Sequence, residues 1–372
     1  MIRIAAKTEA TGKKAMLFRA AAILSALAAS AVIIAIIGYN PFDVFGKIFK
    51  GSLGSAYRFR ETVNKAIPLS VLSLGTAVAF RMKFWNIGAE GQFYMGAFAA
   101  SGIALAFPEL PAPVLLPLMF LTGMLAGAAF CVIPALLKIR FGASETLVTL
   151  MLNYIAQKFV SYLQYGPWKD PAAKGFPKIA TFSDNAILPK LFSIHIGWLI
   201  TLLLAVIVFV FIRRTKIGYE ISVIGESERT AHYAGISVNK VMLIAVAVSG
   251  GLCGIAGMMQ ASAIEHSLSE QLSGGLGFTA VITTWLAQLN PLAVVGVSFL
   301  FSMLIQGGSF LQSSLQIPAS MAQILQGIII FFVLGSEFFL RYKFVFGKSD
   351  KAGAGDDVGK TAEINSDKGA SK

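Results

Sequence analysis

Residues 196–214 decide the fold, and they read IGWLITLLLAVIVFVFIRR. The run carries no charged residue before Arg213 and Arg214. A helix rises ~1.5 Å per residue, so roughly 20 apolar residues cross the ~30 Å hydrocarbon layer of a bilayer. Basic residues commonly follow a membrane span where it meets the aqueous phase. This stretch therefore predicts a membrane-spanning helix.

The same composition extends along all 372 residues, of which 56% are hydrophobic and only 13% are charged. Soluble domains carry about 25% charged residues. They need a polar surface to cover their apolar core, and this chain has too few charged residues to provide one. The sequence therefore predicts an all-α, polytopic membrane protein with about ten transmembrane helices. We expect these near 17–38, 63–82, 87–107, 113–137, 145–165, 196–212, 241–263, 276–290, 291–311 and 320–340.

The two ends of the chain differ from this membrane domain, which we place at 17–346. Residues 1–16 are basic and precede the first apolar run, as in a signal peptide. That run continues to Ile37, beyond the usual signal-peptide core of about 7–15 residues, so we expect a retained first helix. Residues 347–372 are rich in Lys, Asp, Gly and Ser and predict a disordered tail.

Basic residues also indicate an orientation. The two termini with 81–83, 138–140 and 213–240 carry 21 Lys and Arg, against 9 in the loops 47–65 and 169–190. Cytoplasmic loops carry the excess of basic residues in membrane proteins, so we expect both termini in the cytoplasm. The net charge of +12 comes from basic residues that lie beside the apolar segments. It does not form a basic stripe with interleaved aromatics, which argues against a nucleic-acid partner.

Enzyme and metal signatures are absent from the sequence. Cys131 and Cys253 lie inside apolar runs, and no CxxC or Cys/His spacing for a metal occurs. No GxxxxGK[ST], HExxH or GxSxG motif is present. We therefore expect no cofactor, no metal site and no catalytic residue, and we expect that the chain does not bind ATP through a P-loop.

Residues 86–92, which read NIGAEGQ, place an acid and two amides at the edge of an apolar segment. A charged carboxylate is costly in lipid, so Glu90 is expected to face protein or a water-filled cavity. Gly88 and Gly91 would permit a broken helix that lines such a cavity. The alternative is a helix cap, with Asn86 before the helix and Glu90 in its first turns. The residues alone leave both interpretations open.

A second polar group lies at the start of the span 145–165. Glu145, Thr149 and Asn153 are four residues apart and share one helix face. A polar stripe on a spanning helix either lines a pathway or bonds to another helix. We expect Asn153 to line a pathway and Glu145, nearer the helix end, to be structural.

The segment 213–240 is polar and predicted to be cytoplasmic. Residues 225–236 fit a short amphipathic helix that Gly235 would end, with a connecting loop as the alternative. A helix of about two turns is unstable alone and needs a surface to pack against.

Residues 274–278, which read GGLGF, lead into a short span that ends at Asn290 and Pro291. A short, glycine-led segment is the form expected of a re-entrant or discontinuous element, and a tilted short helix is the alternative.

These motifs together resemble a known family. Residues 84–92 resemble the NIGxEGQ signature of ABC importer permeases for simple sugars and nucleosides, a branch of the branched-chain amino acid permease family. Residues 144–156, SETLVTLMLNYIA, are similar to a helix of the same branch, and 275–278 with Asn290-Pro291 match its G-x-G-F…N-P pattern. The resemblance covers roughly 20–345. It departs at 283–289, where Trp285 and Gln288 replace the small residues and glycine of relatives.

The resemblance implies a type II ABC importer-like permease subunit in the bacterial cytoplasmic membrane. Its partners would be a pair of ATP-binding subunits, a second, related permease and an extracytoplasmic binding protein or lipoprotein, within membrane lipid. The solute would be a nucleoside, with a simple sugar or riboflavin as alternatives. An ion-coupled secondary transporter that uses Glu90 is the competing hypothesis.

The resemblance also implies roles for individual residues. The solute pathway would be lined by Asn86, Glu90, Gln92, Thr149, Asn153, Gly277 and Phe278. The short cytoplasmic helix would dock on an ATP-binding subunit. Its coupling residues would be Gly225, Glu226, Arg229, Ala231 and Gly235.

Overall fold

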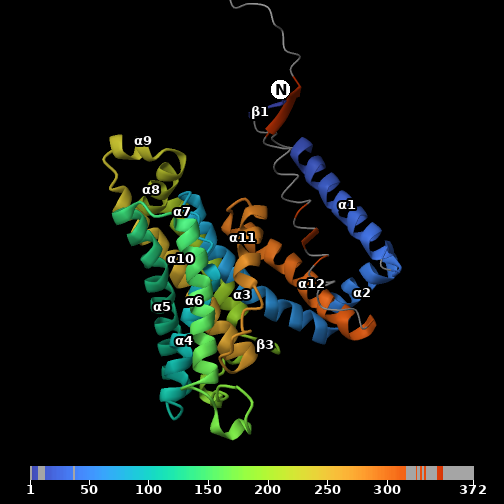
Figure 1. Ribbon diagram of the computed structural model, residues 1–372, viewed down its shortest axis with the longest axis vertical. Helices are drawn as coiled ribbons and strands as arrows, with labels where there is room; N and C mark the ends of the chain where they lie inside the picture. The colour runs from blue at the N-terminus through green and yellow to red at the C-terminus, as the bar shows by residue number, and fades with distance from the viewer. Residues whose placement is uncertain are drawn as a thin grey trace, which may run out of the picture. The chain divides into compact units, whose positions relative to one another are not determined.

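The structure is a computed structural model that describes residues 2–6, 13–36, 38–315, 324, 327, 328, 331 and 342–346. Its helices (Figure 1) are α1 Lys13–Ile36, α2 Pro41–Leu53, α3 Ala56–Arg81, α4 Ala89–Ala106, α5 Ala112–Phe141, α6 Glu145–Tyr165, α7 Gly197–Arg214, α8 Lys216–Glu226, α9 Glu228–Tyr233, α10 Val238–Gln260, α11 Leu276–Leu286 and α12 Pro291–Leu315. Short 3₁₀ turns lie at Pro171–Ala173 and Asp184–Ala186, and a π-helical turn at Ala261–Glu265.

Strands are few and short. The chain forms two compact units, and the smaller contains an antiparallel pair, β1 (Ile2–Ala6) and β4 (Tyr342–Phe346). The larger unit spans Leu27–Ile330 and contains a second pair, β2 (Lys190–Leu191) and β3 (Ile194–His195).

The prediction of an all-α, polytopic membrane protein is confirmed. Within 13–36 and 38–315, five helices are long and apolar enough to cross a bilayer: α3, α5, α7, α10 with its π-helical extension, and α12. Leu27–Ile36 and Pro41–Leu53 form a pair bent by 116° that would count as one further span. Most of the span predicted at 320–340, and the whole predicted tail, lie outside the described residues.

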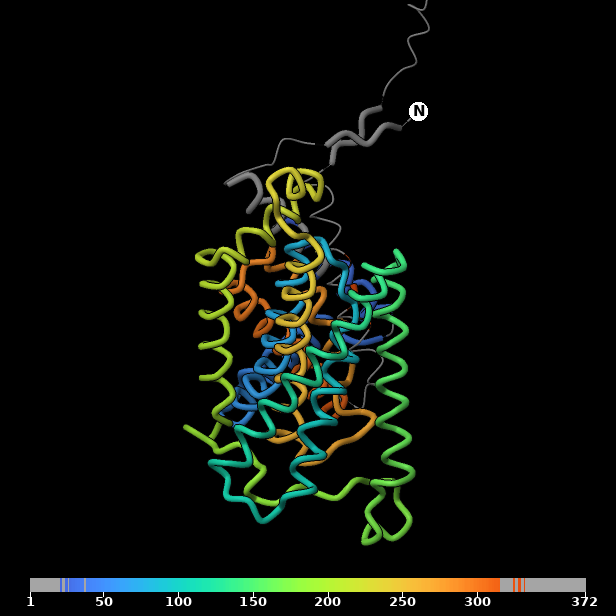
Figure 2. Tube along the Cα trace, turned by 90° about the vertical axis from the view of Figure 1, so that its left-hand side faces the viewer, coloured from blue at the N-terminus to red at the C-terminus, as the bar shows by residue number. Residues whose placement is uncertain are grey.

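Helices α3 and α10 form the centre of the bundle. Of their apolar windows, 83% and 78% are buried, against 22% for α5 and 28% for α7. Helices α6 and α7 stand at opposite edges of the view in Figure 2. The exposed sides of α5 and α7 are rich in leucine, isoleucine and valine, as expected of helices that face lipid tails.

Glycines allow the central helices to approach at backbone distance. A Cβ at Gly96 of α4 would overlap the backbone of Gly254 in α10, and a Cβ at Gly127 of α5 would overlap the carbonyl of Gly250. Close contact of small residues replaces the hydrophobic drive that is missing between helices in lipid. This glycine seam therefore joins α4, α5 and α10.

Helix α11 is a half-length element. It has 11 residues and follows the π-helical turn and the irregular residues 266–275. Two hydroxyl pairs, Ser73–Thr283 and Thr76–Thr284, each 2.5 Å apart, attach it to α3. The predicted segment therefore contains a short helix, which ends at Leu286, four residues earlier than expected, and its re-entrant or discontinuous character in the membrane stays a prediction.

Helices α8 and α9 lie together at one end of the bundle, and the loop 166–195 lies at the other (Figure 1). Gly225 at the end of α8 sits directly on the Arg81 carbonyl, where a Cβ would not fit. The short helix predicted within 225–236 is α9. The sequence did not predict α8, which precedes it.

Candidate functional site

Asn86 and Gln92 form a closed pair of amides at the start of α4. The Asn86 Nδ2 donates to Gln92 Oε1 at 3.1 Å, and the Gln92 Nε2 donates back to Asn86 Oδ1 at 2.8 Å. Asn86 also donates to Ser249 Oγ in α10 at 3.2 Å and accepts from the Gly88 N–H at 3.0 Å. Both amides are at most 1% exposed. Their bonds therefore fix the turn before α4 and attach it to α10.

Asn153 holds α6 to the same turn. Its Nδ2 donates to the Ile87 carbonyl and its Oδ1 accepts from the Gly91 N–H, both at 2.8 Å. Thr149, one turn earlier, is buried and donates to the Thr146 carbonyl of its own helix. The structure thus shows that Asn153 bonds to another helix, while its contact with a solute stays a prediction.

Glu90 caps a helix other than its own. Its Oε2 accepts from the Gly277 N–H of α11 at 2.7 Å, and the carboxyl also interacts with Ser273 and the backbone of Gly275. Gly275, the N-cap of α11, has no side chain to offer, and its φ of +85° favours glycine. A Cβ at Gly277 would lie 2.6 Å from the Glu90 Cα, so only glycine fits there. An acid beside a helix N-terminus stabilises it through hydrogen bonding and the helix dipole.

The remaining predicted residues of this group are less enclosed or bond elsewhere. Phe278, next to Gly277, is 38% exposed. Glu145 forms an ion pair of 2.8 Å with Lys138 across the turn between α5 and α6. Asn86, Glu90, Gln92, Thr149, Asn153 and Gly277 all meet around the start of α4, so the structure brings most of the predicted group together.

Residues 283–289, where the sequence departs from the family pattern, contribute Trp285 to an aromatic cluster. The Trp285 ring stacks on Trp85 with 5.5 Å between centroids, and Phe80 lies 5.7 Å from both. Trp85 is 46% exposed. Trp285 therefore packs the C-terminal end of α11 against the C-terminal end of α3.

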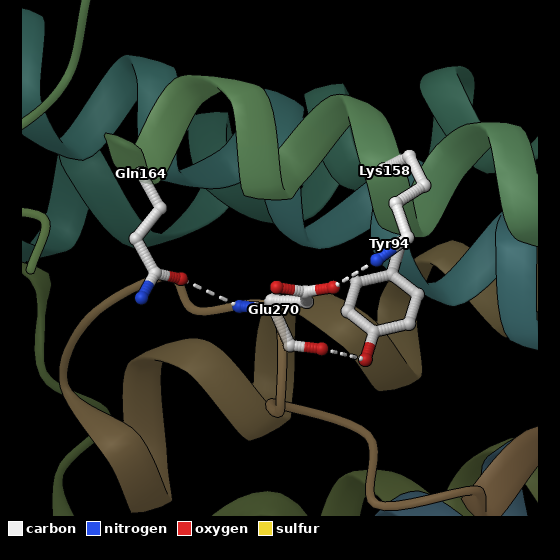
Figure 3. Close-up of polar contacts among 4 residues, drawn as sticks. All are labelled: Tyr94, Lys158, Gln164 and Glu270. Carbon is white, nitrogen blue, oxygen red and sulfur yellow. Dashed lines mark hydrogen bonds and ion pairs between the residues drawn. The ribbon is translucent and has the colours of Figure 1, made fainter. Parts of the chain in front are cut away.

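Polar contacts of Glu270 link the irregular segment before α11 to α4 and α6 (Figure 3). Lys158 of α6 pairs with the Glu270 carboxylate at 2.8 Å, and the Gln164 Oε1 accepts from the Glu270 N–H at 2.8 Å. Tyr94 of α4 donates its hydroxyl to the Glu270 carbonyl at 2.5 Å. These bonds hold 266–275 in place between the two helices.

The predicted coupling residues lie on α8 and α9. Ala231 is fully buried, and the Ile236 N–H donates to its carbonyl at 3.0 Å. Arg229 and Glu226 are exposed, as is the rest of α9, with Tyr233 93% exposed. Gly235 ends the turn with a φ of +74°. Helix α9 is thus anchored through one alanine and presents its other side chains outward.

Sequence reasoning missed two polar residues, Lys65 in α3 and Gln260 at the end of α10, which line one cavity with residues of α12. Gln260 interrupts an otherwise apolar run, and Lys65 directly precedes one. These positions are the signal that could have identified them.

Replacing Asn153 by leucine is expected to weaken the subunit by roughly 2–4 kcal/mol. Both the Gly91 N–H and the Ile87 carbonyl would lose their partner, and an unpaired buried polar group costs about 1–3 kcal/mol. Thermal unfolding of the purified subunit measures this effect. Gln157→Leu, which makes the same change one turn later on a half-buried position of α6, serves as the control and should lose little stability. Equal stability of Asn153→Leu and the wild type would show that these bonds are not needed and would favour a pathway role.

Comparison with known proteins agrees with this architecture. Residues 59–334 match the family described as branched-chain amino acid transport system / permease component. The glucose ABC transporter permease protein TsgB13 of Haloferax volcanii is 31% identical over 86% of this chain and 87% of its own length. The guanosine ABC transporter permease protein NupP of Bacillus subtilis is 31% identical over 90% and 96%. NupQ, a guanosine permease of the same organism, is 29% identical over 64% and 78%.

These similarities confirm the resemblance that the NIGAEGQ and TLMLNYIA motifs indicated, and they support an ABC permease over an ion-coupled transporter. Such a subunit is part of a multi-subunit transport system and is not itself the enzyme. The chain therefore belongs to the branched-chain amino acid transport system permease family, and it is a multi-pass permease subunit of an ABC transporter.

Proposed function

We propose that this chain is one of two permease subunits of an importer in the bacterial cytoplasmic membrane, with α8 and α9 and both termini in the cytoplasm. The single observation that carries this proposal is α9, a helix fixed by the buried Ala231 with all its other side chains exposed. A rigid, exposed helix at one end of a membrane bundle suits docking into a groove of another protein. ATP-driven closure of that partner would move α8 and, through Gly225, the end of α3.

The distribution of basic residues supports this orientation. Arg81 ends α3, Lys138 lies in the last turn of α5, and Arg213 and Arg214 end α7. The ends of α3 and α7 lie near α8, because Gly225 contacts Arg81 and α8 follows α7 directly. Basic residues favour the cytoplasmic face.

The partners follow from the same proposal. Helix α9 would meet one ATP-binding subunit, and a related permease would complete the pathway, as the similarity to both NupP and NupQ supports. An extracytoplasmic binding protein or lipoprotein would deliver the solute. Asn86, Glu90, Gln92, Thr149, Asn153, Gly277 and Phe278 would shape the pathway, in part by fixing α4 and α11.

We propose a nucleoside as the solute, with a simple sugar as the alternative. The relatives named for guanosine and for glucose support these two classes. The test is co-purification of the tagged chain from its own membrane, followed by uptake of labelled guanosine and glucose into proteoliposomes that contain ATP and no ion gradient. Uptake under these conditions is expected. A chain that purifies alone and transports only with an ion gradient would overturn the proposal.

Replacing Gly235 by valine is expected to reduce solute-stimulated ATP hydrolysis roughly 5- to 30-fold. A left-handed φ costs a residue with a Cβ about 1–2 kcal/mol, and more when the side chain is β-branched. Among the described residues, no atom beyond the two chain neighbours lies within 4 Å of the Cβ position, so the effect acts through the backbone at the end of α9.

Gly235→Asn is the matched control, because asparagine tolerates the left-handed region, and it should keep most of the stimulation. Membrane insertion of both variants is checked by the yield of the assembled complex. Normal stimulation in Gly235→Val would refute docking through α9.

A further inference from the structure

A polar cavity of about 310 Å³ lies in the half of the bundle away from α9. Lys65 of α3, which lines it, precedes Arg81 by a helical length of about 24 Å. The remaining polar lining comes from the end of α10 and the π-helical turn, the segment before α11, α11 itself and α12. These residues are Gln260, Glu265, Gln271, Ser273, Thr279, Ser309 and Gln312. The volume is at the lower end of the range for ligand pockets, about 300–1,000 Å³, and suits a single ring.

Gln260 supplies an unpaired acceptor in this cavity. Its side chain is only 8% exposed, and its Oε1 has no hydrogen-bond partner among the described residues. Buried polar atoms are normally paired, and an exception indicates a group that another molecule satisfies. Gln260 is followed directly by the π-helical turn, a rare element that is frequent at functional sites. A donor on a molecule bound in the cavity, together with a small turn of the Gln260 side chain, would satisfy this acceptor.

The charges of the lining favour a neutral ligand. Lys65 and Glu265 contribute one positive and one negative charge, and the Lys65 Nζ donates to Ser309 Oγ at 3.3 Å. An anion would approach the Glu265 carboxylate, and a cation would approach the Lys65 ammonium. The three glutamine amides both donate and accept, as does each hydroxyl of a sugar. A neutral ring with several hydroxyls meets all of these requirements.

The apolar part of the lining argues against a nucleobase. Among the described residues it consists of aliphatic side chains, Leu272, Leu276, Leu304 and Ile305, and contains no aromatic ring. Bases are commonly held by stacking on aromatic side chains. The cavity therefore suits a sugar ring and leaves a base, if one is attached, to lie outside it.

We propose that this cavity binds the hydroxylated sugar ring of the transported solute, with the Gln260 Oε1 accepting a hydrogen bond from a ring hydroxyl. The inference rests on the proposed function and names the part of the solute that is recognised. A free hexose and the ribose of a nucleoside share this chemistry. The relatives named for glucose and guanosine are consistent with either source.

The experiment measures uptake by the complete transporter in proteoliposomes, with each solute compared with analogues that lack one sugar hydroxyl. The analogues are the deoxyguanosines and the deoxyglucoses. The wild type is expected to favour the full solute roughly tenfold, because a site built for a hydroxyl leaves its own polar groups unpaired with the deoxy analogue. Gln260→Leu should raise the KM for the full solute roughly tenfold and abolish discrimination against one analogue. Preference for guanosine or for glucose identifies the source of the ring.

Two further variants keep the test decisive. Gln157→Leu makes the same change on α6, outside the cavity lining, and should transport as the wild type does. Gln271→Leu removes an exposed lining amide in the segment before α11, so it decides the question if Gln260→Leu fails to assemble. Unchanged discrimination in the lining variants would overturn the cavity assignment and leave the importer proposal intact. A wild-type complex that transports neither solute would overturn both.

Discussion

Replacing Gly254 by alanine is expected to prevent assembly of the transporter. A Cβ at this position would overlap the Gly123 carbonyl of α5 and lie 3.1 Å from the Gly127 Cα. Both contacts are with backbone, which cannot rotate away as a side chain can. Overpacking against side chains already costs about 1–3 kcal/mol, so a clash between helix backbones is expected to exceed that cost. The three helices of the glycine seam would separate.

The measurement is the yield of assembled complex after gentle extraction from the membrane, which should fall more than roughly tenfold. Gly251→Ala is the matched control on the same helix. Its Cβ would lie 3.1 Å from the Met124 Cγ, the middle of a flexible side chain that can move, so near-normal yield is expected. Equal yields from the two variants would show that the seam is not limiting for assembly.

Long apolar runs predicted the bounds of several helices well. The run 196–212 became α7, and 87–107 became α4, each within two residues at either end. A span in lipid is set by length and hydropathy, both of which are properties of the local sequence. The prediction was wrong at the start of α3, which begins at Ala56 instead of near residue 63. The charged residues Arg58, Arg60 and Glu61 lie in its first turns, so the apolar pattern did not indicate a helix there.

The sequence singled out the polar residues that meet around the start of α4, but it did not predict which groups they bond to. The motif 86–92 indicated either a cavity lining or a cap of its own helix. The structure instead pairs Glu90 with Gly277, 187 positions later. Helix α8 and the aromatic contact of Trp85 with Trp285 were missed for the same reason. Such partners are chosen by tertiary packing, and no local pattern in a single sequence specifies them.

Replacing Glu90 is expected to have the second large effect, a loss of solute uptake. Glu90→Leu is expected to reduce solute uptake at least roughly tenfold, because the Gly277 N–H would lose its acceptor, which costs about 1–3 kcal/mol, and because α11 would lose its cap, which costs about 1 kcal/mol more. Helix α11 has only 11 residues, so the loss of one cap weakens its first turn, which then keeps the side-chain bond of the Leu276 N–H to Ser273 Oγ. Uptake into proteoliposomes with ATP measures the loss, and the yield of complex shows whether assembly persists.

Glu90→Gln separates capping from ion coupling. The glutamine carbonyl still accepts from Gly277, although a neutral acceptor forms a weaker bond than a carboxylate, so uptake should fall only a few-fold. A carrier that moved ions through this acid would instead lose coupled uptake entirely in Glu90→Gln, since the amide cannot exchange a proton or balance a cation. We therefore expect Glu90 to act in transport by fixing the start of α11, and near-normal, ATP-dependent uptake by Glu90→Gln beside an inactive Glu90→Leu is the result that this role requires.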